Sequence, residues 1–154
     1  ELIADHSWSH DYPTQVSGGW SLAYLRDQFR RTNAELAALT GSPVCFVRPP
    51  GGFRTNVRAA ASGLRMTAEL WSVDSEDWKQ PPRTTAAATR RIVANATAAD
   101  GQAHPIVLMH STKASHEPES LVSSYRGNTA AALSRVIEWY RNHGYRFVTL
   151  DGAA

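Results

Sequence analysis

Two histidines near the start of the chain, His6 and His10, are spaced so that both imidazoles can face one point. Residues four apart lie on the same side of a helical turn, and imidazole nitrogens are good ligands for zinc and similar divalent ions. A histidine pair in a turn rich in hydroxyl groups and tryptophan is nevertheless more often structural. The pair therefore gains weight only from other chemically capable residues elsewhere in the chain.

Three later stretches carry such residues directly after apolar runs. They are Arg48-Pro49-Pro50-Gly51-Gly52, Asp74-Ser75-Glu76-Asp77-Trp78 and Leu108-Met109-His110. Each follows a predicted strand, and α/β folds place their chemistry at strand ends. The four stretches together predict a site built from loops at one end of a sheet.

His110 is the candidate general acid, because imidazole titrates near neutral pH and can give a proton to a leaving group. Asp77 or Asp74 would accept a hydrogen bond from His110 and keep its ring protonated. The competing interpretation of His110 is a core histidine with its hydrogen bonds satisfied. Trp78 offers an apolar face for a sugar ring, whereas Leu108 taken alone is a core residue.

Arg48 leaves its strand before two prolines, and a buried arginine there needs an acidic partner. The alternative is an ordinary salt bridge at the strand end. The prolines force an extended path, and Gly51 and Gly52 allow the backbone to approach a ligand closely. Asp5 precedes His6 but points the opposite way along a strand. It is interpreted as a hydrogen-bond partner of a ligand or as a solvated carboxylate, not as a ligand itself.

The elements that must position these residues alternate between strand and helix, which predicts a parallel sheet with covering helices. Strands are expected at 1–5, Val44–Val47, Arg65–Val73, Ile106–Met109 and Tyr145–Leu150. Helices are expected from a cap at Ser21 to Gly41, from Thr55 or Asn56 to Ser62, from Thr84 or Thr85 to near Gly101, and from a cap at Asn128 to Gly144. Five strands are too few for a closed eight-fold barrel.

The composition limits the function classes. The chain has 154 residues, enough for one domain, and a net charge of +2, which gives no argument for nucleic-acid binding. Its single cysteine, Cys45, excludes an internal disulfide and is expected to be a small buried hydrophobe. No membrane-spanning stretch or signal peptide is visible.

The four stretches, in this order, resemble the motifs of the polysaccharide deacetylase family, the NodB-homology carbohydrate esterases of family 4. The resemblance spans Glu1 to about Leu150. It implies an α/β fold of the polysaccharide deacetylase type, a distorted and incomplete (β/α) barrel. Residues 1–154 would then form a single NodB-like domain, the larger C-terminal part of it, with the N-terminal strands missing from this chain.

The resemblance also implies an activity, the metal-dependent removal of acetyl groups from a polysaccharide. The substrate would be chitin or peptidoglycan containing N-acetylglucosamine, or acetylated xylan. His6 and His10 would hold a divalent metal, zinc first and cobalt or nickel as alternatives. Such proteins are expected to be secreted or in the cell envelope.

The remaining roles follow from the same resemblance. Arg48 would orient the catalytic base, and Asp77 would be the partner of the acid His110. The backbone N–H of Gly51 would help to hold the oxyanion, and Leu108 would line the pocket for the acetyl methyl group. Most relatives carry Tyr or Phe where this chain has Gly51, so the substrate preference is expected to differ.

One family motif, Thr-Phe-Asp-Asp-Gly, has no counterpart in the sequence. It would supply the catalytic base and a third metal ligand, so this chain alone is expected to be inactive or nearly so. A cleaved N-terminal piece or another chain is expected to supply the segment. The rival hypothesis is a non-catalytic, carbohydrate-binding relative that has lost the base.

Overall fold

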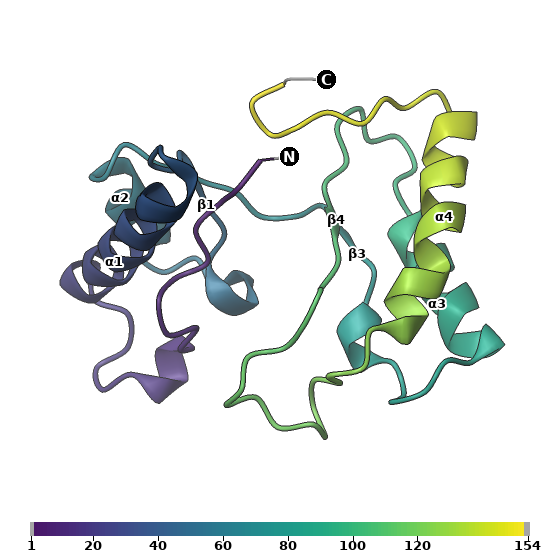
Figure 1. The fold of residues 1–154 in the computed structure, drawn as a ribbon, viewed down its shortest axis with the longest axis horizontal. Helices are drawn as coiled ribbons and strands as arrows, with labels where there is room; N and C mark the ends of the chain where they lie inside the picture. Colours follow the sequence, from purple (N-terminus) through teal and green to yellow (C-terminus); the bar gives the residue numbers. More distant parts are fainter. Residues whose placement is uncertain (1, 153–154) are drawn as a thin grey trace. The chain divides into compact units, whose positions relative to one another are not determined.

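The structure is a computed structural model that describes residues 2–152; Glu1, where the first expected strand would begin, lies outside the described residues. The chain divides into two compact units, Glu1–Leu70 and Trp71–Ala154. Figure 1 shows helices α1 and α2 in the first unit and α3 and α4 in the second. Each unit is described by itself.

The first unit is dominated by α1, Leu22–Thr40. The hydroxyl of Ser21 accepts the Tyr24 backbone N–H at 3.1 Å, and Gly41 ends the helix at φ 79°. Both ends agree with the sequence prediction. A helix end needs partners for its unpaired backbone groups. A polar cap supplies an acceptor at the start, and a residue that adopts positive φ terminates the last turn.

Helix α1 packs on α2, Val57–Ser62, and two short parallel strands lie beside them, β1 (Phe46–Val47) and β2 (Thr67–Ala68). The expected first strand is reduced to a bridge between Asp5 and Val47. The Asp5 N–H donates to the Phe46 carbonyl, and the Asp5 carbonyl accepts the Arg48 N–H, both at 2.9 Å. The segment before His6 is therefore fixed along β1.

The core of the first unit contains Trp20, Leu25, Phe29, Val44, Val47, Val57, Ala60, Ala61 and Met66. Leu39, near the end of α1, is 74% exposed. The prediction that Cys45 is buried is wrong. Cys45 is exposed, although its backbone carbonyl accepts the Thr67 N–H at 2.8 Å.

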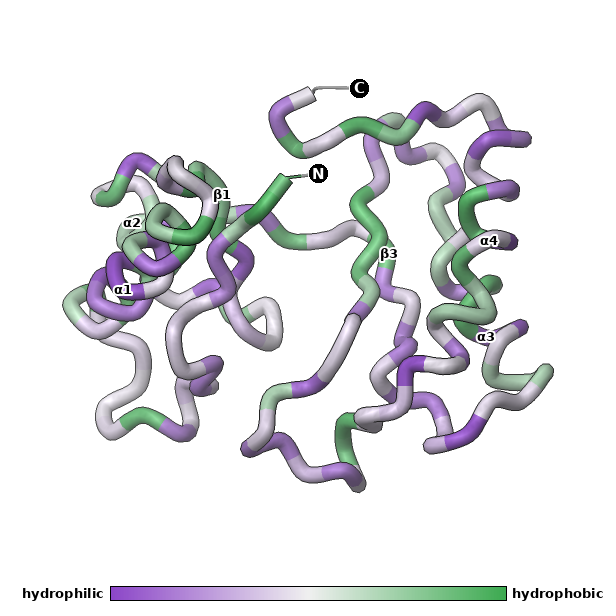
Figure 2. The backbone as a smooth tube through the Cα atoms, in the orientation of Figure 1, coloured by the Kyte–Doolittle hydropathy of each residue, from purple (hydrophilic) through white to green (hydrophobic). Residues whose placement is uncertain are grey.

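The second unit holds the parallel pair β3 (Val73–Asp74) and β4 (Val107–Leu108) and the helices α3 (Ala86–Ala96) and α4 (Gly127–Asn142), which pack together. Its core cluster contains Val73, Ala96, Ala99, Val136 and Tyr140. Figure 2 shows hydrophobic and hydrophilic stretches alternating along α4, as one buried stripe requires.

Three expected elements of this unit differ in the structure. The strand expected at Arg65–Val73 is split into β2 and β3, one in each unit. Tyr145–Leu150 forms no strand, because the described backbone gives it no neighbouring strand to pair with. Helix α3 ends at Ala96, about a turn before the predicted end near Gly101, at a cap on Thr97.

The start of α4 also differs from the prediction. Asn128 lies inside the helix and is not its cap; its side chain accepts the Thr85 N–H at 3.0 Å and donates to the carbonyls of Pro81 and Arg83. It thereby joins the start of α4 to the start of α3.

The fold class is a mixed α/β arrangement with short parallel strands, as the alternation of elements predicted. No helix among residues 2–152 has the length and hydropathy needed to span a membrane.

Candidate functional site

The turn that carries His6 and His10 follows Asp5, whose backbone is paired with β1. The Nδ1 atom of His6 lies 2.6 Å from the carbonyl oxygen of Arg48, and the two imidazole centroids are 5.0 Å apart at an interplanar angle of 67°. The turn is not helical, because Ser7 and His10 adopt φ of 66° and 58°. The rings nevertheless meet, as their spacing predicted.

This geometry fits two ligands of one metal ion. Two imidazoles on a tetrahedral zinc with Zn–N distances of about 2.0–2.1 Å place their centroids roughly 5 Å apart. A hydrogen bond from Nδ1–H to a backbone carbonyl, as His6 can make to Arg48, fixes the ring tautomer in which Nε2 is the nitrogen that can bind a metal. Residues 2–152 contain no cluster of three metal-ligating side chains, so the pair supplies part of a coordination shell.

Asp5 holds the start of the turn and is fully buried. Its Oδ1 accepts the Ser7 N–H at 2.7 Å, and the Ser7 hydroxyl accepts the His10 N–H at 3.1 Å. Burial raises the pKa of Asp5 to about 7, against the opposing effect of the Ser7 N–H. The prediction of a solvated carboxylate is wrong, and Asp5 instead braces the turn between the two histidines.

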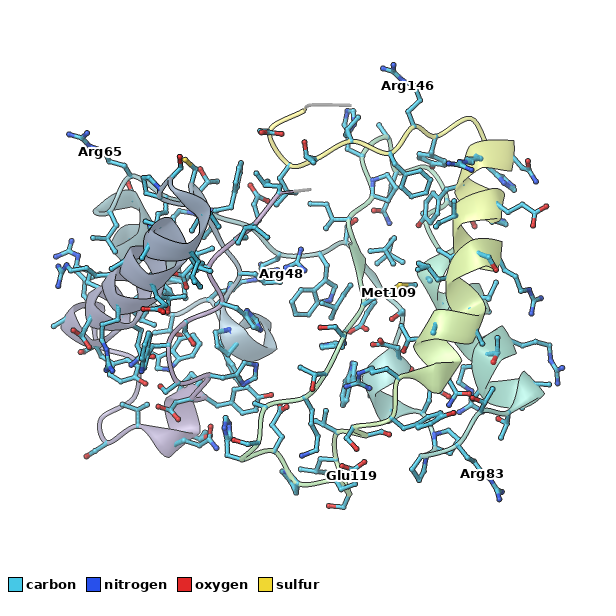
Figure 3. All side chains as sticks on the ribbon, viewed as in Figure 1. Arg48, Arg65, Arg83, Met109, Glu119 and Arg146 are labelled. Carbon is cyan, nitrogen blue, oxygen red and sulfur yellow. The ribbon has the colours of Figure 1, made fainter. Side chains whose placement is uncertain are left out.

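Arg48, labelled in Figure 3, follows β1 and is half-buried. Burial lowers the pKa of its guanidinium, and the charge of Glu69 opposes that effect. Within residues 2–152 its buried Nε atom has no hydrogen-bond partner. The guanidinium therefore retains a donor for an acidic group, the partner that the sequence predicted it to need.

Gly51 lies in the turn Pro50–Gly52 with φ 59°. A Cβ atom at this position would lie 2.9 Å from Cε2 of Phe53 and 3.1 Å from Cε1 of Tyr12. The left-handed backbone and the two rings both favour glycine here. The rings of Phe53 and Tyr12, whose centroids are 5.5 Å apart, occupy the space into which a side chain at Gly51 would project.

In the second unit, His110 and Asp77 form a close pair. Nδ1 of His110 lies 2.7 Å from Oδ1 of Asp77, and the His110 backbone N–H donates to Oδ2 at 2.9 Å. Asp77 has no exposed surface, whereas the His110 side chain is 32% exposed. Asp74, the other carboxylate considered, accepts the Glu76 N–H at 2.8 Å. The structure therefore pairs His110 with Asp77.

Further donors surround Asp77. The hydroxyl of Thr129 donates to Oδ2 at 3.0 Å, and the Asp77 N–H points to Ser75 Oγ at 3.3 Å. Burial is the largest effect on the pKa of Asp77 and raises it, but the hydrogen bonds and charge of His110, with the Thr129 hydroxyl, outweigh burial and leave the pKa below its ordinary value. Asp77 is thus held as a carboxylate that orients the imidazole.

Trp78 is half-buried, and the Lys79 Nζ atom lies 4.6 Å from its ring centroid. Trp78 also lines a pocket of about 210 Å³ together with Gln80, Glu119 and Leu121. Glu119 is labelled in Figure 3 on the long segment before α4. Leu108 is 6% exposed in β4, so most of its surface packs in the unit.

Sequence reasoning missed two polar residues that support these groups, Gln28 and Thr129. Both are buried, and each lies on the apolar face of its helix: Gln28 one turn after Leu25, and Thr129 seven residues before Val136. A polar residue within a buried stripe is rare and requires a hydrogen-bond partner. That pattern was the available signal.

The chain is similar to polysaccharide deacetylases. The family profile described as polysaccharide deacetylase matches residues 2–68. The peptidoglycan-N-acetylglucosamine deacetylase PgdA of Listeria monocytogenes is 32% identical over 97% of this chain and 26% of its own length. The peptidoglycan-N-acetylmuramic acid deacetylase PdaC of Bacillus subtilis is 30% identical over the same shares. The chain thus spans about a quarter of the length of these curated relatives.

Solved structures agree with the sequence matches. The Bc1960 peptidoglycan N-acetylglucosamine deacetylase superposes with a TM-score of 0.77 at 26% identity, over 99% of this chain and 63% of that one. BA3943 of Bacillus anthracis, a family 4 pseudoenzyme, superposes with a TM-score of 0.67 at 28% identity, over 93% of this chain and 42% of that one. The same fold therefore occurs in a protein named as a deacetylase and in one named as a pseudoenzyme.

Proposed function

Because this chain belongs to the polysaccharide deacetylase family, carbohydrate esterase family 4, we propose that it contributes to a metal-dependent hydrolase that removes acetyl groups from a polysaccharide. The substrate class is peptidoglycan or chitin containing N-acetylglucosamine, with acetylated xylan as the alternative. The names of the relatives, which act on peptidoglycan, favour the first class and a place in the cell envelope.

In this proposal, His6 and His10 bind the metal. A divalent ion, zinc first and cobalt or nickel as alternatives, supplies an activated water for attack on the acetyl carbonyl. His6 binds through Nε2, because its Nδ1 is engaged by the Arg48 carbonyl at 2.6 Å. The 5.0 Å separation of the rings supports their action as a pair.

His110 donates a proton to the departing amine or alkoxide. Asp77, held as a carboxylate 2.7 Å from Nδ1, fixes the ring so that its other nitrogen carries the transferable proton. The partly exposed imidazole can reach a substrate, whereas the fully buried carboxylate cannot. Asp77 therefore acts through His110.

The groups that contact substrate are proposed from the same residues. The backbone N–H of Gly51 donates to the oxyanion, Leu108 lines the acetyl methyl pocket, and Trp78 contacts a sugar ring. Arg48 orients the base carboxylate through its Nε donor, which has no hydrogen-bond partner within residues 2–152. The pocket beside Trp78 offers room for a polar group of the polysaccharide.

The sequence has no Thr-Phe-Asp-Asp-Gly motif, so the base and third ligand are proposed to come from outside residues 1–154, either from a further segment or from a second chain. With that addition, both units form part of one NodB-like domain, a distorted and incomplete (β/α) barrel.

The observation that carries the proposal is the hydrogen-bonded pair of His110 and the buried Asp77, an arrangement suited to acid catalysis. Its test is acetate release from N-acetylglucosamine oligomers by residues 1–154 with zinc, with and without added formate as a substitute for both missing carboxylates, the base and the third metal ligand. Acetate release that rises with formate and is lost in His110→Gln supports the hydrolase. No release at any formate concentration contradicts it.

A non-catalytic carbohydrate-binding protein is the second candidate, and the similarity to the pseudoenzyme BA3943 favours it. This hypothesis predicts that the same oligomers bind without acetate release and that His110→Gln leaves their binding affinity unchanged. Isothermal titration with the wild type and this variant separates the two functions.

A further inference from the structure

We propose that Gln28, on the buried face of α1, is a positioning residue that fixes His6 and His10 for metal binding; the inference rests on the proposed function of these histidines. Gln28 is 6% exposed. Its Oε1 accepts the Trp8 N–H at 3.2 Å and the Ser9 N–H at 2.9 Å. Two consecutive backbone N–H groups between the histidines thus donate to the same side-chain oxygen of Gln28.

The turn needs such support because two of its residues have positive φ. Ser7 and His10 adopt φ of 66° and 58°, a region that non-glycine residues seldom occupy. Without contacts from outside, the turn would relax towards ordinary backbone angles and His10 would swing away from His6. The Gln28 carbonyl fixes Trp8 and Ser9, the two residues that lie between these strained positions.

Other contacts from α1 act on the same turn. The Tyr24 hydroxyl donates to Asp11 Oδ2 at 2.9 Å, and the Arg31 guanidinium lies 4.5 Å from the Trp8 ring centroid. The Ser9 hydroxyl, 2.6 Å from Asp11 Oδ2 and 2.9 Å from the Gln28 oxygen, can donate to either. Gln28 differs from these contacts because it is buried and binds the backbone itself.

Metal-binding side chains that are already held in place bind the metal more tightly, because less conformational entropy is lost on binding. Gln28→Met keeps the length and volume of the side chain but removes the acceptor. Gln28→Glu keeps an acceptor in the same place. The acceptor hypothesis therefore predicts that the Met variant loses affinity and that the Glu variant recovers it.

The experiment is a zinc titration of residues 1–154, with unfolding temperatures of the metal-free proteins measured alongside. We expect Gln28→Met to weaken zinc binding by about 10-fold or more, and Gln28→Glu to bind at least as well as wild type. Asn33→Leu is the control on the same helix, since Asn33 bonds the Val44 backbone and not the turn. It should lower stability without changing the affinity.

Unchanged zinc affinity in a folded Gln28→Met variant would overturn the proposal. If that variant does not fold, amide hydrogen exchange of the metal-free wild type decides: protected Trp8 and Ser9 amides support the role of Gln28, and freely exchanging amides refute it. If the wild type binds no zinc but its Trp8 and Ser9 amides are protected, the proposed metal function is contradicted, whereas the role of Gln28 in fixing the turn is still supported.

Discussion

The backbone N–H and the imidazole Nδ1 of His110 contact different oxygens of one carboxylate, Oδ2 and Oδ1 of Asp77, at 2.9 and 2.7 Å. Asp77 thereby fixes both the position and the ring orientation of His110. A buried carboxylate that accepts several hydrogen bonds stabilises the folded state through them only while it is ionised.

The first prediction concerns pH. Because the folded-state pKa of Asp77 lies below its ordinary value of 3.8, the stabilisation from its ionised form is present above that value and is lost as pH falls through the folded pKa. Asp77→Asn should lower the free energy of unfolding by about 1.5–3 kcal/mol at pH 7. The gap between wild type and variant should narrow below pH 4, as measured by urea unfolding; a gap independent of pH would contradict this.

A second prediction concerns Thr129, which donates to Asp77 Oδ2 at 3.0 Å. Thr129→Val replaces the hydroxyl with a methyl group of similar size and should cost about 1–3 kcal/mol, because a buried carboxylate loses a donor. Thr129→Ser retains the hydroxyl and should cost less. Chemical denaturation at pH 7 compares them, and equal losses in the two variants would show that packing, not the hydrogen bond, matters.

The third prediction tests the turn at Gly51. Gly51→Ala places a Cβ 2.9 Å from the Phe53 ring at a backbone φ of 59°, so it should destabilise the protein by about 1–2 kcal/mol. The matched control is Gly18→Ala, which also has positive φ but no atom within 4 Å of the added Cβ. Thermal unfolding should show a larger loss of stability for Gly51→Ala than for Gly18→Ala. A smaller loss for Gly51→Ala would contradict this and show that the Phe53 and Tyr12 rings can shift at little energetic cost.

The fourth prediction concerns the start of α1. Ser21→Ala removes the oxygen that accepts the Tyr24 N–H at 3.1 Å and should cost about 1 kcal/mol. Ser21→Asp keeps an acceptor and should retain most of the stability. Urea unfolding of the three proteins checks this, and an Ala variant as stable as wild type would show that the cap contributes nothing.

Local signals in the sequence predicted both ends of α1 and the approach of the His6 and His10 rings. The cap at Ser21, the terminator Gly41 and the spacing of His6 and His10 act within a few residues, so they can be read without tertiary information. Their places after predicted strands left either Asp74 or Asp77 as the partner of His110. The family resemblance favoured Asp77, which is the residue that the structure pairs with His110.

Features that depend on distant partners were not readable. Arg65–Val73 looked like one strand, because its apolar content does not reveal that its two ends pair with different neighbours, β1 and β4. Asn128 looked like a cap, but its side chain bonds residues more than 40 positions away. The bracing roles of Gln28 and Thr129 likewise depend on the chain that each helix faces.

The most direct test of the central claim is a zinc titration of residues 1–154 and of the His6→Ala and His10→Ala variants, with His104→Ala as control because His104 is an exposed histidine of the second unit. We predict about one zinc ion per wild-type chain, the same for the control, and a loss of binding in both turn variants. Zinc binding that survives both substitutions, or no binding by the wild type, would contradict this prediction.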